Sequence, residues 1–219
     1  MKLVIGLGNP GAEYPGTRHN VGFDVIAELG RRYGVGKPQQ KYQAEHLDVL
    51  IKSEKVVLVS PLTYMNRSGE SVWQFVRFYK PENDQIVVIC DDMNLPTGRL
   101  RWRPSGSAGG QKGLKDIIDR LGHQDFPRLR VGIGRPQGKK DVTSWVLGKF
   151  RPDEKEDVEH AILRAADSVE HWIANGIEQT MTAFNRSAND EKSQANEKKN
   201  SGKSSDKEEN NSAGSNAAS

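Results

Sequence analysis

The sequence has a single cysteine among 219 residues and no long hydrophobic run. One thiol excludes an internal disulfide and a cysteine-based metal site. Cys90 ends an apolar run, and we expect it to be a buried core residue rather than a nucleophile. The five histidines form no metal-binding cluster in the sequence, so we expect no metal and no other cofactor.

No apolar stretch approaches the ~20 residues that a membrane-spanning helix needs. The amino terminus enters a predicted strand at once and lacks a signal-peptide pattern. We therefore expect a cytoplasmic protein without a membrane partner. The formal net charge of +3 is compatible with an RNA partner but does not require one.

Residues 187–219 contain none of the larger apolar residue types, namely Val, Ile, Leu, Met, Phe, Tyr and Trp. Such a segment cannot bury enough apolar surface to offset the entropy that it would lose on ordering. We therefore predict one domain over residues 1–186 and a disordered polar tail over residues 187–219.

The predicted domain alternates strands with helices. Apolar runs and period-two alternation predict strands, whereas apolar residues that recur every three or four positions predict helices. Strands are expected at 2–7, 44–52, 55–60, 86–90, 98–103 and 129–133, and helices at 20–29, 68–79 and 113–121, with one or two more at 153–184. This interleaving indicates the α/β class.

The loop after the first strand carries the most informative residues of the chain. Asn9 lies at the carboxyl end of that strand, which is the edge where ligands bind in open α/β sheets. His19 stands just before the first predicted helix, where an imidazole is well placed to act as a general base. These two side chains are the first members of a predicted site.

The glycines of this loop also fit the G-x-G-x-x-G pattern of dinucleotide-binding folds. That function requires a helix that begins inside the loop and an acidic residue near the end of the second strand. Pro10 and Pro15 keep the chain out of a helix until about Asn20, and Glu28, at the appropriate distance, falls inside the helix. We therefore reject the nucleotide-binding interpretation.

Three more loops, at 61–69, 90–96 and 106–113, carry polar groups next to predicted strands or helices. Asp91 ends a buried strand, where it could hold one ring nitrogen of His19 and leave the other to activate water. Asn9 and Asn66 can donate amide hydrogen bonds to an acyl oxygen without bringing charge. Each residue also has a structural interpretation, as a turn residue or a helix cap. Together they favour direct hydrolysis by water.

Six segments in this order resemble the bacterial-type peptidyl-tRNA hydrolases. They are GLGNPG at 6–11, TRHN at 17–20, MNRSG at 65–69, DDMNLP at 91–96, GLKD at 113–116 and RLRVGIG at 128–134. The resemblance covers residues 1 to about 186. It implies a monomeric α/β fold with a mixed, twisted central sheet flanked by helices. It also implies hydrolysis of the ester that joins a peptide to the terminal ribose of tRNA, which returns the tRNA to translation.

The resemblance further implies roles for single residues. His19 would be the base, Asp91 its partner, and Asn9 and Asn66 the amides that hold the substrate. We assign Tyr14 and Met65, from the same loops, to substrate binding as well. Family precedent places a clamp on the tRNA 5′ phosphate at two basic positions, which here are Arg103 and Arg130; a guanidinium suits bidentate phosphate binding. The implied partner is peptidyl-tRNA, contacted at its acceptor stem, 3′ end and 5′ phosphate.

The chain departs from the family before the GLKD segment, where many members have His-Asn and this chain has Gln111-Lys112. An ammonium cannot accept a hydrogen bond as an amide oxygen can. Lys112 is therefore expected to contact phosphates at the tRNA 3′ end, or Gln111 to take over the amide function. Asn94, where an aspartate is common, removes a charge near Asp91. The competing function is a non-hydrolytic RNA-binding protein of the same fold.

Overall fold

The computed structural model describes residues 1–136 and 141–185, and the predicted tail at 187–219 lies outside them. Seven strands form one sheet in the order β2-β3-β4-β1-β5-β7-β6. The strands are β1 (Lys2–Gly6), β2 (Gln39–Lys41), β3 (Ala44–Ile51), β4 (Glu54–Pro61), β5 (Ile86–Asp92), β6 (Leu100–Arg103) and β7 (Arg128–Gly132). The helices are α1 (Val21–Tyr33), α2 (Ser68–Tyr79), α3 (Lys112–Leu121), α4 (Val142–Val146) and α5 (Lys155–Phe184).

The sheet is mixed, as predicted. The four central strands run parallel, because β1 pairs with β4 and β5, and β5 pairs with β7. At the edges, β2, β3 and β6 pair antiparallel with their neighbours. The carboxyl ends of β4, β1, β5 and β7 therefore meet at one edge of the sheet, which is where polar loops gather in open α/β folds.

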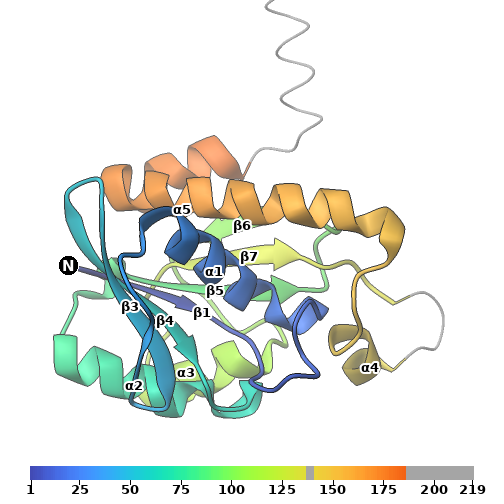
Figure 1. Cartoon of the computed structure of the whole chain (residues 1–219), viewed down its shortest axis with the longest axis horizontal. Coiled ribbons are helices and arrows are strands. Elements are labelled where there is room, and N and C mark those ends of the chain that lie inside the picture. Colours follow the sequence, from blue (N-terminus) through green and yellow to red (C-terminus); the bar gives the residue numbers. More distant parts are fainter. Residues whose placement is uncertain (137–140, 186–219) are drawn as a thin grey trace, which may run out of the picture. The chain divides into compact units, whose positions relative to one another are not determined.

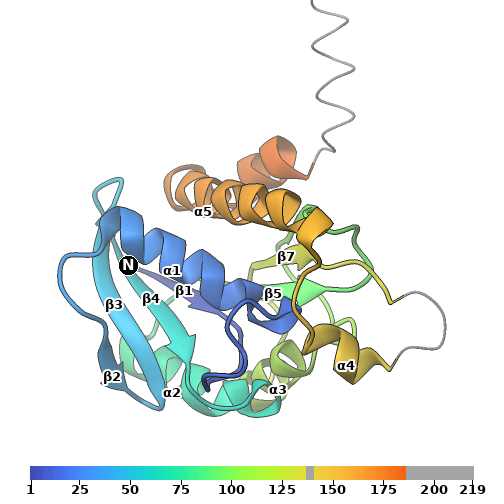
Figure 2. The same ribbon diagram turned by 45° about the vertical axis from the view of Figure 1, so that its right-hand side comes forward.

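Helices cover both faces of the sheet (Figures 1 and 2). On one face, α1 and α5 pack on side chains such as Val4, Ile89 and Trp102. On the other, α2 and α3 pack on side chains such as Ile5 and Cys90. Neighbouring strand residues thus enter different cores, which explains why the central strands read as continuous apolar runs.

Two glycines, Gly6 at the end of β1 and Gly22 in α1, allow this helix to pack closely on the strand. A Cβ atom on Gly6 would lie 2.2 Å from the carbonyl oxygen of Gly22, and one on Gly22 would lie 2.5 Å from the backbone nitrogen of Leu7. Real side chains do not tolerate such contacts, so α1 can approach β1 only because both positions lack a side chain. This close approach also brings the start of α1, and His19 just before it, to the end of β1.

The predicted strands and helices are present, with ends displaced by a few residues at most places. Two short elements were missed, because β2 has only three polar residues and α4 only five residues. His19 lies in a 3-10 turn, η1 (Arg18–Asn20), that leads into α1. The closing segment is one helix, α5, interrupted by non-helical backbone at Gly176. Among the described residues, no helix is long and apolar enough to cross a membrane.

Candidate functional site

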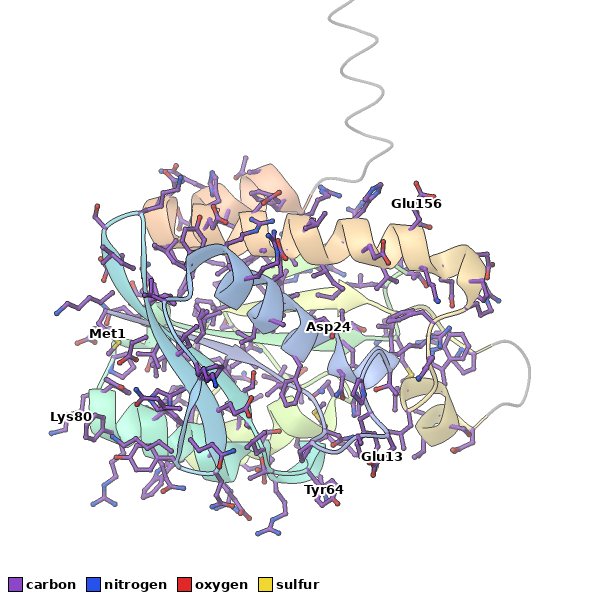
Figure 3. The ribbon with its side chains drawn as sticks, viewed as in Figure 1. Met1, Glu13, Asp24, Tyr64, Lys80 and Glu156 are labelled. Carbon is purple, nitrogen blue, oxygen red and sulfur yellow. The ribbon has the colours of Figure 1, made fainter. Side chains whose placement is uncertain are left out.

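A cavity of about 320 Å³ opens at the carboxyl edge of the sheet. Its walls come from the loops that follow β1, β4 and β5, from the start of α3, and from α4. The lining residues are Asn9, His19, Tyr64, Met65, Asn66, Asp91, Asp92, Met93, Asn94, Gly109, Gly110, Gln111, Lys112, Arg130, Val142, Thr143, Val146 and Leu147. Tyr64 stands exposed at this rim, with its side chain directed away from the ribbon (Figure 3).

His19 and Asp91 form a buried pair at this cavity. The Nδ1 atom of His19 lies 2.9 Å from the Oδ1 atom of Asp91, and the two residues are 8% and 3% exposed. A carboxylate only accepts hydrogen bonds, so this contact places a proton on Nδ1. In the neutral ring, Nε2 then keeps its lone pair. The contact predicted from the sequence is therefore present, and it selects the tautomer that a general base needs.

The amide of Asn9 is held in one orientation. Its Oδ1 atom accepts a hydrogen bond of 2.8 Å from the backbone nitrogen of Met65. Its backbone is tied to Asn20, whose side chain accepts from the Asn9 nitrogen at 2.9 Å and donates to the Asn9 oxygen at 3.0 Å. With the oxygen occupied, the Nδ2 group of Asn9 is the part of the amide left to serve a ligand in the cavity.

Asn66 and Met65 lie in the 3-10 turn η2 (Met65–Arg67) before α2. Asn66 is exposed at the cavity, and the N-cap of α2 is Arg67, so Asn66 is not the helix cap that its alternative interpretation required. Met65 is buried, with 4% exposure, and its sulfur accepts a contact of 3.0 Å from Gln111 Nε2. Asn66 is thus available to a ligand, whereas Met65 forms a buried part of the cavity wall.

Gln111 points its amide into the protein. It is 7% exposed and caps α3, because its Oε1 atom accepts a hydrogen bond of 2.6 Å from the backbone nitrogen of Leu114. Its Nε2 group lies 3.1 Å from Asp91 Oδ1. The sequence suggested that Gln111 offers its amide to the substrate, but both ends of this amide are engaged by protein atoms. Lys112, the first residue of α3, is exposed and lines the cavity.

Arg130 is more enclosed than a phosphate clamp would suggest. Its Nη1 atom lies 3.1 Å from Asp92 Oδ2, and its Nη2 atom donates to the carbonyl oxygens of Ser107 and Ala108 at 2.8 and 3.2 Å. Gly109 lies directly over this guanidinium, where an added Cβ would come within 3.0 Å of Nη1. Arg130 therefore fastens the 104–111 loop to the sheet while its edge reaches the cavity.

Arg128 also binds the 104–111 loop. Its guanidinium donates to the carbonyl oxygens of Phe126 and Gln124, at 3.1 and 2.8 Å, and also to that of Gly106. Burial lowers the pKa of Arg128 to about 10, which still leaves the group charged at neutral pH. With Arg130, it fixes the glycine-rich loop that carries Gln111 to the cavity.

Arg103 lies on β6, outside the cavity. It pairs across the strands with Arg128, as Arg101 does with Arg130, so these four side chains share one face of the sheet. Arg101 and Arg103 are exposed, and they line a second depression together with Leu95, Arg99 and Asn185. The two positions of the predicted clamp therefore lie diagonally on adjacent strands, two residues apart in register, with Arg103 exposed and Arg130 buried.

Tyr14 lies outside the set of residues that line the cavity, and its main visible role is a turn in which its carbonyl accepts from Thr17 Oγ1 at 2.7 Å. Conversely, the sequence did not indicate the apolar wall formed by α4. This helix is fastened near His19 by Arg18, which stacks 3.9 Å from the centre of the Trp145 ring and contacts Glu154 at 2.5 Å. Arg18 and these two partners lie far apart in the sequence, so no local pattern indicates the contact.

The described residues do not support a metal site or a cysteine nucleophile. No group of three or more His, Cys, Asp or Glu side chains among them is placed to hold a metal ion. Cys90 is fully buried in the sheet, and desolvation raises the pKa of its thiol to about 12. A thiol in that state is not a nucleophile at neutral pH. The arrangement is suited to general-base activation of water, with Asn9 and Asn66 lining the same cavity as His19.

Comparison with known proteins gives one consistent result. A family model described as peptidyl-tRNA hydrolase matches residues 3–194. The peptidyl-tRNA hydrolase of Rhodopirellula baltica is 50% identical over 188 residues, which is 86% of this chain and 99% of that protein. The one from Syntrophomonas wolfei is 46% identical over 185 residues, 84% of this chain and all of that protein. The crystal structure of the Acinetobacter baumannii peptidyl-tRNA hydrolase superposes with a TM-score of 0.80 at 36% identity, covering 84% of this chain and 94% of that one.

Proposed function

This chain belongs to the peptidyl-tRNA hydrolase family, and we propose that it cleaves the ester between a peptide and the 3′-terminal ribose of tRNA, with His19 as the general base. The observation that carries the assignment of roles is the buried contact of 2.9 Å between His19 and Asp91 at the cavity. Nothing in this cavity's described residues favours the non-hydrolytic alternative, because the base, its partner and the amides stand together.

The chemistry follows from the tautomer of His19. Asp91 holds the proton on His19 Nδ1, so His19 Nε2 removes a proton from a water molecule. The oxygen of that water attacks the carbonyl carbon of the ester. The carbonyl oxygen becomes an oxyanion, which the Nδ2 groups of Asn9 and Asn66 stabilise by hydrogen bonds. Collapse of this intermediate breaks the bond to the ribose oxygen, which takes the proton back from the imidazolium. The products are a free peptide and a tRNA with its terminal hydroxyl restored.

Each supporting residue has a defined task in this mechanism. The hydrogen bond that the backbone nitrogen of Met65 donates to Asn9 Oδ1 keeps the Nδ2 group of Asn9 directed at the substrate. Asn66 is exposed at the cavity and completes the binding of the acyl oxygen. The apolar residues of α4 exclude water from one side, which strengthens the hydrogen bonds inside the site. Tyr14 does not line the cavity, so it would bind only those parts of the substrate that extend beyond the cavity.

The tRNA contacts form a second part of the proposal. Arg103 is exposed on β6 and presents its guanidinium to a phosphate, for which the 5′ phosphate of the acceptor stem is the candidate. Arg130 adds positive charge on the adjacent strand, but its guanidinium donates its hydrogen bonds to Asp92 and to the 104–111 loop. Lys112 is exposed and lines the cavity, where it would contact the 3′ end of the tRNA. We propose that one monomer binds one peptidyl-tRNA in the cytoplasm.

A direct assay tests the proposed function. Purified protein is incubated with a peptidyl-tRNA that carries a labelled peptide, and released peptide and deacylated tRNA are measured over many turnovers. Multiple turnovers with equal amounts of the two products are expected. Stoichiometric binding without release of peptide would overturn the proposal and establish the RNA-binding alternative instead.

A further inference from the structure

Gln111 connects three parts of the site through one side-chain amide. Its oxygen accepts from Leu114 N at 2.6 Å, and its nitrogen lies 3.1 Å from Asp91 Oδ1 and 3.0 Å from Met65 Sδ. These neighbours fix the orientation of the amide. The backbone nitrogen can only donate and the carboxylate can only accept, so exchanging the two ends of the amide would lose both hydrogen bonds.

Asp91 uses the same oxygen for both of its partners. Oδ1 accepts from His19 Nδ1 at 2.9 Å and from Gln111 Nε2 at 3.1 Å. Two donors that converge from different elements, η1 and the start of α3, leave this carboxylate little freedom to rotate. The carboxylate also lies near the amino end of α3, where the helix dipole favours negative charge.

We infer that Gln111 is a positioning residue of the His19–Asp91 pair rather than a substrate ligand: it holds the Asp91 carboxylate toward the imidazole and shares its charge. This inference rests on the proposed function for its catalytic meaning. It also explains how Gln and Lys can follow the two glycines of this loop. The amide serves the interior of the site, while Lys112, one residue later, is exposed and lines the cavity.

Loss of the Gln111 donor changes the pair in a predictable direction. Asp91 would keep His19 as its remaining donor, and its negative charge would act on the imidazole undivided. An anion that interacts more strongly with the ring favours the protonated form. The charged groups that face the cavity beside this pair are Asp92 with its partner Arg130, and Lys112. Asp92 and Arg130 bind each other, and Arg130 also binds the carbonyl oxygens of Ser107 and Ala108, so neither is hydrogen-bonded to the Gln111 amide and the change originates in Asp91.

Two variants separate this role from helix capping. Gln111→Ser keeps a good N-cap oxygen for α3 but is too short to reach Asp91. Gln111→Glu keeps the length and the cap oxygen but replaces the donor by a second acceptor beside Asp91. We expect Gln111→Ser to melt within a few degrees of the parent, and Gln111→Glu to melt lower because it buries a second carboxylate beside Asp91. Against peptidyl-tRNA, kcat at pH 7 should fall about 3- to 10-fold for Gln111→Ser and more for Gln111→Glu, with KM changed less than about twofold.

The decisive readout does not depend on turnover. The ring signals of His19 are followed by nitrogen NMR against pH, assigned by comparison with His19→Gln. In Gln111→Ser the midpoint of this titration should move to higher pH by about half a unit or more, and the acid limb of the kcat–pH profile should move with it. An unchanged midpoint in both variants would overturn the inference and leave Gln111 as a helix cap. A rise in KM at unchanged kcat would overturn it in favour of substrate binding.

These results are distinguishable from failure of the proposed function. If the parent protein does not hydrolyse peptidyl-tRNA, the proposed function fails, yet the shift of the His19 titration still tests the contact between Gln111 and Asp91. If the parent turns over and the titration does not respond, only the role of Gln111 is wrong.

Discussion

Asp91 and Asp92 are consecutive at the end of β5 but bind different partners. Asp91 contacts His19 at 2.9 Å, whereas Asp92 contacts Arg130 at 3.1 Å. The alternation of side chains along a strand causes this division. One carboxylate therefore serves the imidazole, and its neighbour serves the guanidinium that fastens the 104–111 loop.

The two carboxylates should respond differently to the same substitution. Asp91→Asn should lower kcat by about 10- to 100-fold, because an amide can present the wrong group to His19 Nδ1 and no longer stabilises the imidazolium. Asp92→Asn should lower kcat less than about threefold but reduce the melting temperature, because Arg130 loses its charge partner while 90% buried. Steady-state kinetics and thermal melting check this pair. Equal losses of kcat would contradict the separate roles.

Asn9 and Asn66 test how the acyl oxygen is held. Asn9→Ala should lower kcat by up to about 10² to 10³-fold, since it removes a preorganised donor and also frees the nitrogen of Met65. Asn66→Ala should cost less, because this side chain is exposed and less constrained. Measured kcat and KM decide the matter. Losses confined to KM would mean that the amides position the substrate without stabilising the oxyanion.

Arg103 tests the contact with the tRNA backbone. Arg103→Ala should raise KM for full-length peptidyl-tRNA and flatten the dependence of log KM on log salt concentration by about one unit, the value for one lost phosphate contact. A peptidyl-nucleoside without a 5′ phosphate should be hydrolysed as by the parent. Arg31→Ala, which removes an exposed arginine from α1 on the other side of the sheet, serves as the charge-matched control. An equal defect on both substrates would rule out a phosphate contact.

Lys112 tests whether a cation at the start of α3 contributes to substrate binding. Lys112→Met should reduce kcat/KM about tenfold at low salt, the scale of a charge-assisted hydrogen bond, and the loss should shrink as salt is added. Lys112→Asn should recover part of the activity. A Lys112→Met protein that matches the parent across the whole salt series would assign Lys112 to a solvated helix start.

Local sequence predicted much of the fold and part of the site. The contact between Asp91 and His19 could be predicted, because Asp91 ends a buried strand and His19 precedes the helix that follows the first strand. The inward-facing amide of Gln111 could not be predicted, because it depends on how Arg128 and Arg130 pin the 104–111 loop. The enclosed state of Arg130 has the same origin. Strand β2, with the sequence Gln-Gln-Lys, forms through pairing with β3 rather than through any apolar pattern.

Single-turnover hydrolysis of a defined peptidyl-tRNA by His19→Ala tests whether His19 is the general base. The measurement is made with enzyme in excess, alongside tRNA binding by the same protein. We expect a rate constant about 10² to 10⁴-fold below that of the parent, the usual contribution of a positioned general base, with tRNA affinity within about twofold. A rate within a few-fold of the parent would show that His19 is not the general base.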